Sequence, residues 1–167
     1  MYRTIACSLA LLLASGVATA SGRFVAYGAH GQAEGGSVAG HAAGFRGPNG
    51  ATGAHGRRTV SDGQGNVTSN AGGNWRGSGG GTATTRATAT HNADGTGSFD
   101  RNTNATGAQG GTFAGQTTGA QGQGITHSAS ATGAAGNSYS CSTTVTRDGV
   151  THTGSCSNAA GESIACH

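Results

Sequence analysis

The amino-acid sequence predicts a mostly β protein built from repetitive antiparallel hairpins or a β-solenoid-like stack. Extensive irregular or disordered Gly-rich segments and a small core complete the expected fold. The first observation is composition, since the 167 residues include 34 glycines, 29 alanines, 23 threonines and 16 serines. The second is a set of Asp-Gly pairs between alternating segments, a strong hairpin signal. The third is that glycine interrupts every window that could form an amphipathic helix.

Residues 1–20 read as a secretory signal peptide. Arg3 supplies the positive start, Ile5 to Val17 is apolar, and Ala18-Thr19-Ala20 is a small-residue cleavage site. The apolar run is too short for a membrane-spanning helix, which needs about 20 residues. The sequence therefore predicts a protein without a membrane span that is secreted to the extracellular space, the cell surface or the periplasm.

Few large apolar side chains remain after residue 20, because every leucine lies in the predicted signal peptide. Burial of apolar surface stabilises by about 25 cal/mol per Å², and ordering a residue costs about 1–2 kcal/mol. So small a set of side chains predicts a thin β structure held mainly by backbone hydrogen bonds. The formal net charge of +3 is low, so no nucleic-acid partner is expected.

Amino-acid composition and local sequence pattern divide the rest of the chain into three parts. Residues 21–56 form a Gly/Ala/His-rich segment that we expect to be flexible. Residues 57–137 form a Gly/Thr-rich region of degenerate β repeats, and residues 138–167 form a Cys-containing C-terminal hairpin. The repeats are irregularly spaced: the unit T-G-A-x-G begins at Thr52, Thr106, Thr118 and Thr132.

Three Asp-Gly pairs predict two-residue hairpin turns: Asp62-Gly63, Asp94-Gly95 and Asp148-Gly149. A type I′ turn needs two residues at positive φ, which Asp and Gly tolerate. Alternating Thr-, Ser- and Val-containing segments flank the pairs, as expected for the strands of a hairpin.

The cysteines give the most specific prediction. If Asp148 and Gly149 form the turn, Cys141 and Cys156 lie directly opposite each other, which favours a disulfide between them. Cys166 is then an unpaired or intermolecular thiol. Alternatively, Cys166 replaces Cys141 as the partner of Cys156.

No catalytic, cofactor-binding or metal-binding residues are predicted. The seven histidines lack metal-ligand spacing, and the chain contains neither a G-x-S-x-G elbow nor a P-loop. Six acidic residues, three of them in predicted turns, form no catalytic constellation. We therefore expect a protein that is not an enzyme.

These observations favour a secreted structural or adhesive protein of the cell surface or extracellular matrix that self-assembles through β structure. Its Gly/Ser/Thr/Asn/Gln texture is similar to that of bacterial functional-amyloid and curli-like subunits, but the regular Gln and Asn positions of curlin repeats are absent. The expected partners are further copies of the chain or a surface polysaccharide.

The alternative is a threonine-array protein that binds polysaccharide or ice. Thr84, Arg86, Thr88 and Thr90 share one face of an alternating strand. Flat threonine arrays of this kind look like those of ice-binding proteins.

Overall fold

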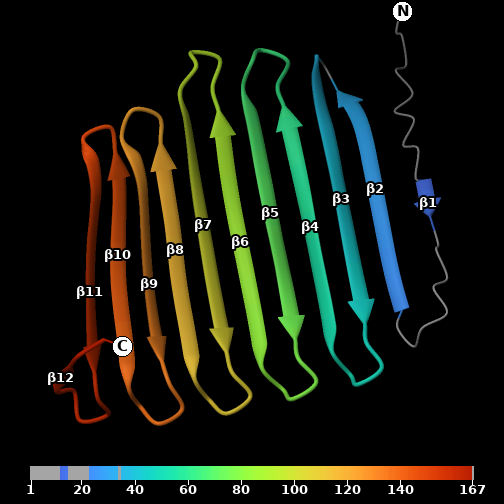
Figure 1. Ribbon diagram of the computed structural model, residues 1–167. Helices are drawn as coiled ribbons and strands as arrows, with labels where there is room; N and C mark the ends of the chain where they lie inside the picture. The colour runs from blue at the N-terminus through green and yellow to red at the C-terminus, as the bar shows by residue number, and fades with distance from the viewer. Residues whose placement is uncertain (1–11, 15–22, 34, 167) are drawn as a thin grey trace, which may run out of the picture.

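The protein is a single open β-sheet whose strands follow one another in sequence order (Figure 1). The computed structural model describes residues 12–14, 23–33 and 35–166. Twelve strands occur there, every neighbouring pair is antiparallel, and no helix is found in those ranges. The predicted fold of successive antiparallel hairpins is therefore confirmed, and the solenoid-like variant is not adopted.

Ten strands of similar length make up the body of the sheet, and a short strand flanks each edge. In order they are β1 Leu12–Ala14, β2 Arg23–Ala33, β3 Gly36–Arg46, β4 Thr52–Ser61, β5 Val67–Arg76, β6 Thr82–His91, β7 Gly97–Thr106, β8 Thr112–Ala120, β9 Gly124–Thr132, β10 Ser138–Thr146, β11 Gly149–Ser157 and β12 Ser163–Ile164.

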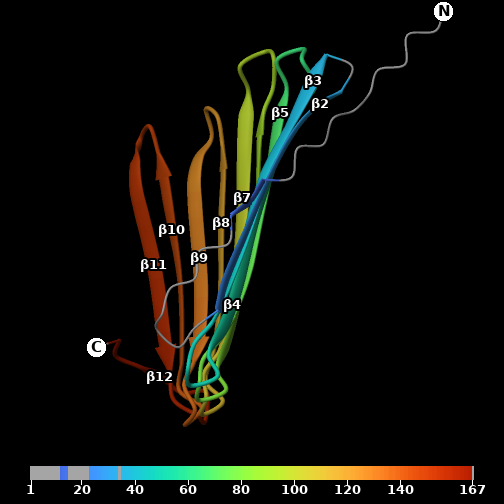
Figure 2. The same ribbon diagram turned by 90° about the vertical axis from the view of Figure 1, so that its right-hand side faces the viewer.

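The sheet is one layer thick and twisted, and its edge-on view shows no second sheet packed on either face (Figure 2). No hydrophobic side chain among the described residues is buried. An isolated hairpin is only marginally stable in water, so the joined strands support one another through their backbone hydrogen bonds. The small predicted core is thus reduced to the contacts that side chains make along each face.

A fifteen-residue unit repeats through the first two thirds of the sheet. Glycines with positive φ occur at positions 35, 50, 65, 80, 95 and 110, each fifteen residues after the last, and Gly63 is the one further positive-φ glycine in this range. Each full unit contains a strand of about ten residues and a loop of five. After residue 110 the strands shorten to nine residues and the period is lost, with the next positive-φ glycines at 122, 124, 136, 149 and 161.

Six of the seven five-residue loops share one hydrogen-bond pattern, whereas the loop 62–66 keeps only the bond from Asp62 N–H to the Asn66 carbonyl. In the loop 107–111, Gly110 N–H donates to the Gly107 carbonyl at 3.0 Å, and Gly107 N–H donates to the Gly111 carbonyl at 2.6 Å. The first bond closes a type I-like turn, and the glycine at position four takes the left-handed conformation that returns the chain to the sheet. The same pair of bonds closes the loops at 47–51, 77–81, 92–96, 133–137 and 158–162.

The structure differs from the sequence prediction in the segment 21–56. This segment supplies β2, β3 and the first half of β4, and β4 crosses the predicted boundary at residue 56 without a break. Its Gly- and Ala-rich composition suggested flexibility, but ladder hydrogen bonds use backbone groups and therefore do not require large side chains.

Replacing Gly110 by alanine should destabilise the sheet by about 1–2 kcal/mol, because its φ of 90° is costly for an L-residue. An added Cβ there would meet no atom within 4 Å, so the loss would report backbone conformation alone. Gly107→Ala is the matched control: it lies in the same loop, lacks a positive φ and would make only ordinary contacts. Urea unfolding of both variants measures the difference, and equal losses would contradict the assigned role of Gly110.

Candidate functional site

The two faces of the sheet differ in chemistry, and the strand register determines which residues each face carries. Directly paired residues of neighbouring antiparallel strands point to the same face. One transverse row of such pairs, here called the aromatic row, crosses the sheet near the 47–51 loop. It consists of Phe45, Gly53, Trp75, Ala83, Ala105, Phe113, Ala131, Tyr139, Cys156 and Ile164.

Aromatic rings in this row lie over glycines of the neighbouring strands. A Cβ added at Gly53 would collide with the ring of Phe45 from one side and approach Trp75 Cδ1 to 2.8 Å from the other. Gly53 is also the only described residue that is buried. The missing side chain thus makes room for two rings, an arrangement known to stabilise glycine within sheets.

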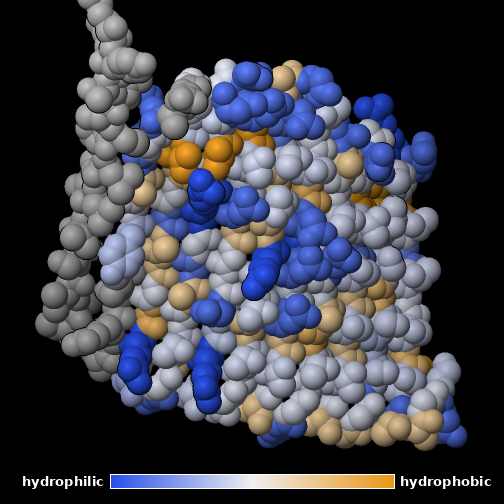
Figure 3. All heavy atoms as spheres, turned by 180° about the vertical axis from the view of Figure 1, so that it is seen from behind, coloured by the Kyte–Doolittle hydropathy of each residue, from blue (hydrophilic) through white to orange (hydrophobic). Residues whose placement is uncertain are grey.

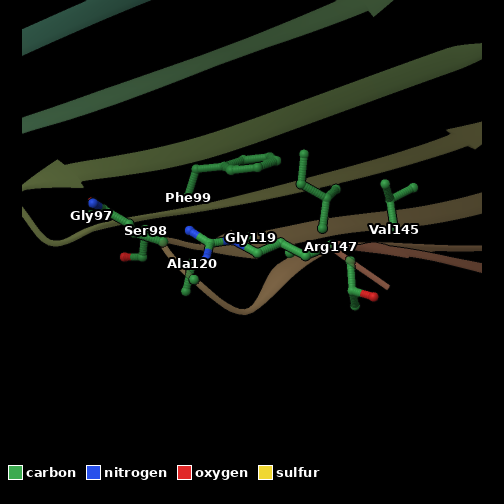
Figure 4. A pocket seen from close by; sticks show the side chains of 12 residues that line it. Gly97, Ser98, Phe99, Gly119, Ala120, Val145 and Arg147 are labelled. Carbon is green, nitrogen blue, oxygen red and sulfur yellow. The ribbon is translucent and has the colours of Figure 1, made fainter. Parts of the chain in front are cut away.

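A second apolar row, here called the aliphatic row, crosses the last strands near the opposite ends. It consists of Phe99, Gly119, Ile125, Val145 and Val150. The Phe99 ring covers Gly119, where an added Cβ would come within 2.6 Å of Cε1. A shallow depression lies at this row, and Phe99 and Val145 rise from one side of the strands while Ser98 and Ala120 lie on the other (Figure 4).

Polar side chains separate the two apolar rows and pair with one another across the strands. Thr117 Oγ1 lies 2.8 Å from His127 Nδ1, and Thr143 Oγ1 lies 2.7 Å from His152 Nδ1. Arg57 Nε donates to Ser69 Oγ at 2.8 Å. These contacts satisfy the polar groups within the face. We call the whole face, with its aromatic and aliphatic rows, the apolar face.

Exposure of large apolar side chains is concentrated on the apolar face. Nine such side chains are exposed among the described residues, and eight of them lie on this face. Trp75, Phe113 and Tyr139 each keep 38% of their surface exposed, and Val150 keeps 67%. The exception is Tyr27 on the opposite face. The two apolar rows therefore distinguish this face from the opposite one.

The opposite face carries mainly hydroxyl and amide side chains, and we call it the hydroxyl face. Viewed from that side the surface is mostly pale, with scattered blue polar groups and few orange ones (Figure 3). One of its rows, here called the threonine row, is Arg58, Asn70, Thr88, Asp100, Thr118, Thr126, Thr144 and Thr151.

Hydroxyl side chains of the hydroxyl face bond to their direct neighbours across the strands. Thr88 Oγ1 donates to Asn70 Oδ1 at 2.9 Å. The Ser138 and Ser157 hydroxyls are 2.7 Å apart, and the Thr126 and Thr144 hydroxyls are 3.3 Å apart. Thr84, Arg86, Thr88 and Thr90 all lie on this face, as the alternation of β6 predicts. The neighbouring strands extend that single line into a two-dimensional array.

Five of the six predicted turn residues lie between strands, in loops of different kinds, and the sixth, Gly149, is the first residue of β11. Asp62 and Gly63 begin a five-residue loop, whereas Asp94 and Gly95 occupy the third and fourth positions of another. These two Asp-Gly pairs have the same sequence but occupy different positions in their loops. Asp148 is in the only two-residue loop among the fully described connections, which consists of Arg147 and Asp148, and Gly149 already begins β11.

The carboxylates of the first two turns hold their loops by accepting hydrogen bonds. Donation from the Asn66 side chain, and from the Gln64 N–H at 2.7 Å, lowers the pKa of Asp62 below its usual value. Donation from the Thr96 hydroxyl at 2.6 Å, and from its N–H at 2.8 Å, lowers the pKa of Asp94 in the same way. Both carboxylates therefore stay ionised at neutral pH and act as structural acceptors.

The disulfide differs from the predicted pair of Cys141 with Cys156. Cys156 is joined to Cys166, with Cα atoms 5.5 Å apart, and Cys141 is a free thiol. The turn lies one residue earlier than predicted, so Cys141 faces Gly154 and Cys156 faces Tyr139. This is the alternative in which Cys166 replaces Cys141, and it ties β12 to the edge of the sheet.

The free thiol of Cys141 lies on the apolar face beside Tyr139. A hydrogen bond between these two side chains raises the pKa of the Tyr139 hydroxyl above its usual value. Cys141 is half-buried and lines a shallow depression together with Gly115 and Ala129 of the neighbouring strands.

No group of three His, Cys, Asp or Glu side chains among the described residues is placed to hold a metal ion. Residues 12–14, 23–33 and 35–166 contain no helix long and apolar enough to cross a membrane. The predicted signal peptide lies outside the described residues except for Leu12–Ala14, which form β1.

Comparisons of this chain with protein-family models, with curated proteins and with solved structures find no match. The alternation of β6 predicted one line of the hydroxyl face, Thr84 to Thr90, whereas the aromatic row was not predicted. The fifteen-residue glycine period is the signal that would have placed Phe45 and Trp75 in one row.

In the exported chain, without Cys7 of the predicted signal peptide, thiol mapping should find Cys156 joined to Cys166 and one reactive thiol at Cys141. Alkylation without reduction, followed by mass analysis of peptides, measures both. Cys141→Ser should remove the reactive thiol and leave the disulfide, whereas Cys166→Ser should release Cys156. A recovered Cys141–Cys156 peptide would show that the β10–β11 turn lies at Asp148-Gly149 instead.

Proposed function

We propose that the protein is a secreted, non-enzymatic structural component of the cell surface or extracellular matrix that assembles by pairing the apolar faces of two copies. The observation that carries this proposal is the placement of eight of the nine exposed large apolar side chains on one face of a one-layer sheet. A second copy of the same face supplies the layer that this sheet lacks, as in a β-sandwich.

The size of the face supports a permanent contact. Ten strands at about 4.8 Å spacing and about ten residues of 3.4 Å give a face of roughly 1,600 Å². Two such faces would bury roughly 3,200 Å² in total, within the range of obligate homodimers. The two sheets would approach to about 10 Å, which suits the alanines and glycines that alternate with rings in the aromatic row.

Export supports the same proposal. A disulfide within the chain is compatible with an oxidising, extracellular location. After face pairing, the outer surface would be the hydroxyl face, whose threonine, serine and asparagine side chains suit contact with water or with a hydrated matrix.

Sedimentation of the exported protein should show at least two chains per particle. Trp75, the only tryptophan, should shift its fluorescence to shorter wavelength with rising concentration as its exposed 38% loses water. Trp75→Ser with Phe113→Ser should weaken association at least tenfold, since each removed ring loses more than 1 kcal/mol of burial. Val60→Ser is the matched control: Val60 lies on the hydroxyl face of the interior strand β4, away from both edges, and its replacement should leave association unchanged. A monomer at all concentrations would contradict face pairing.

A second candidate function is binding of a flat polysaccharide or ice surface by the hydroxyl face. The observation that favours it is the threonine row, in which Thr118, Thr126, Thr144 and Thr151 follow one another on successive strands. Their hydroxyls repeat at the strand spacing of about 4.8 Å, and rows two residues apart repeat at about 6.8 Å.

Thr88→Tyr should reduce binding of this kind several-fold, because the ring would stand above the array and keep a flat ligand away. Co-sedimentation with insoluble polysaccharide and measurement of thermal hysteresis test the two ligands separately. Trp75→Ser, on the other face, is the control. Absence of both activities in the unsubstituted protein would exclude this candidate.

A further inference from the structure

The sheet ends at two edges that short strands cover only in part. β1 pairs with Ala26, Tyr27 and Gly28 of β2, and β12 pairs with Cys156 and Ser157 of β11. We infer that these edges recognise each other: β11 of one copy pairs with β2 of the next, so that copies join into a continuous sheet. The inference rests on the proposed structural function and adds a second, independent contact to it.

Strand direction permits this contact. Neighbouring strands alternate in direction throughout the sheet, and ten strands run from β2 to β11. β2 and β11 therefore run in opposite directions, as the ribbon shows (Figure 1). A second copy moved sideways without rotation would place its β2 antiparallel to β11. Such a head-to-tail contact never closes on itself and generates a filament.

The open stretch of β11 fits within the longer open stretch of β2. β12 covers β11 from Cys156 onward, which leaves Gly149 to Ser155, or seven residues, open. On β2, the strand β1 belongs to the predicted signal peptide, so export would open this edge. Keeping every transverse row aligned between copies places Gly149 to Ser155 opposite Val25 to Gly31, also seven residues. In this register Thr151 faces Ala29, and Thr153 faces Tyr27.

The chemistry of the edges favours pairing as well. Soluble proteins protect open edges with lysine, inward-pointing charges, proline or a bulge. The segments 25–31 and 149–155 contain no lysine, arginine, aspartate, glutamate or proline. Tyr27, the exposed aromatic residue of the hydroxyl face, would meet Thr153, and an aromatic ring beside a β-branched residue stabilises a cross-strand pair.

Edge pairing also agrees with face pairing. Sideways translation keeps the apolar face of every copy on the same side. Two such filaments could then pair their apolar faces along their whole length. Strands would lie across the filament axis, with a repeat of about 48 Å for ten strands.

Charged residues placed at Ala29 and Thr151 test the predicted register. Both positions lie on the hydroxyl face at opposite edges of one copy, so they can meet only between copies. The Lys/Lys variant carries Ala29→Lys and Thr151→Lys, and the Glu/Lys variant carries Ala29→Glu and Thr151→Lys. The critical concentration for filament growth is measured at low salt by sedimentation and electron microscopy, using protein exported from the full-length sequence.

The Lys/Lys variant should need about tenfold more protein for growth than the Glu/Lys variant, because like charges directly opposite destabilise a strand pair. High salt should reduce this difference. Equal critical concentrations for the two variants, or a Glu/Lys variant that forms no filaments, would overturn the register and the edge contact.

The two contacts fail in different ways. A face-paired dimer whose Trp75 fluorescence is blue-shifted, with no assembly larger than the dimer, would overturn the edge contact. The proposed function would then still stand. Filaments whose critical concentration rises with the Lys/Lys substitution, while Trp75 fluorescence does not shift on assembly, would support the edge contact and overturn face pairing.

Discussion

Backbone hydrogen bonding between neighbouring strands is the interaction on which the whole structure depends. No buried apolar side chain supports the described sheet from a second layer, so each strand is held by the strands beside it. Regular pairing therefore matters more than side-chain volume. Six of the connections use the shared five-residue loop, which preserves that regularity by returning the chain in register.

Small residues follow from this constraint. Glycine at Gly53 and Gly119 lets the rings of Phe45 and Phe99 lie along the sheet, which covers backbone that no second layer protects. Eight of the nine exposed large apolar side chains lie on one face, and threonine and serine predominate on the other. Amphipathic character thus belongs to the sheet as a whole, although no single strand shows it strongly.

The sequence predicted the β class and the hairpins from alternation and turn residues, but not the details of the loops. Asp148-Gly149 is a good type I′ pair, yet the chain turns at Arg147-Asp148, and this shift of one residue moves Cys141 away from Cys156. The unit T-G-A-x-G forms a loop at Thr106 but lies within β4 at Thr52. The fourth position of the loop requires glycine, but the residues around it vary. The fifteen-residue period is therefore difficult to recognise in the sequence.

The fifteen-residue unit also limits how such a gene can change in length. Deleting one unit would reverse the direction of every later strand, so the aromatic row would be broken and its rings would fall beside threonines. Deleting or duplicating two units restores both direction and row. Length variants that fold should therefore differ by thirty residues, or ninety nucleotides. The proteins encoded by such genes would contain even numbers of long strands.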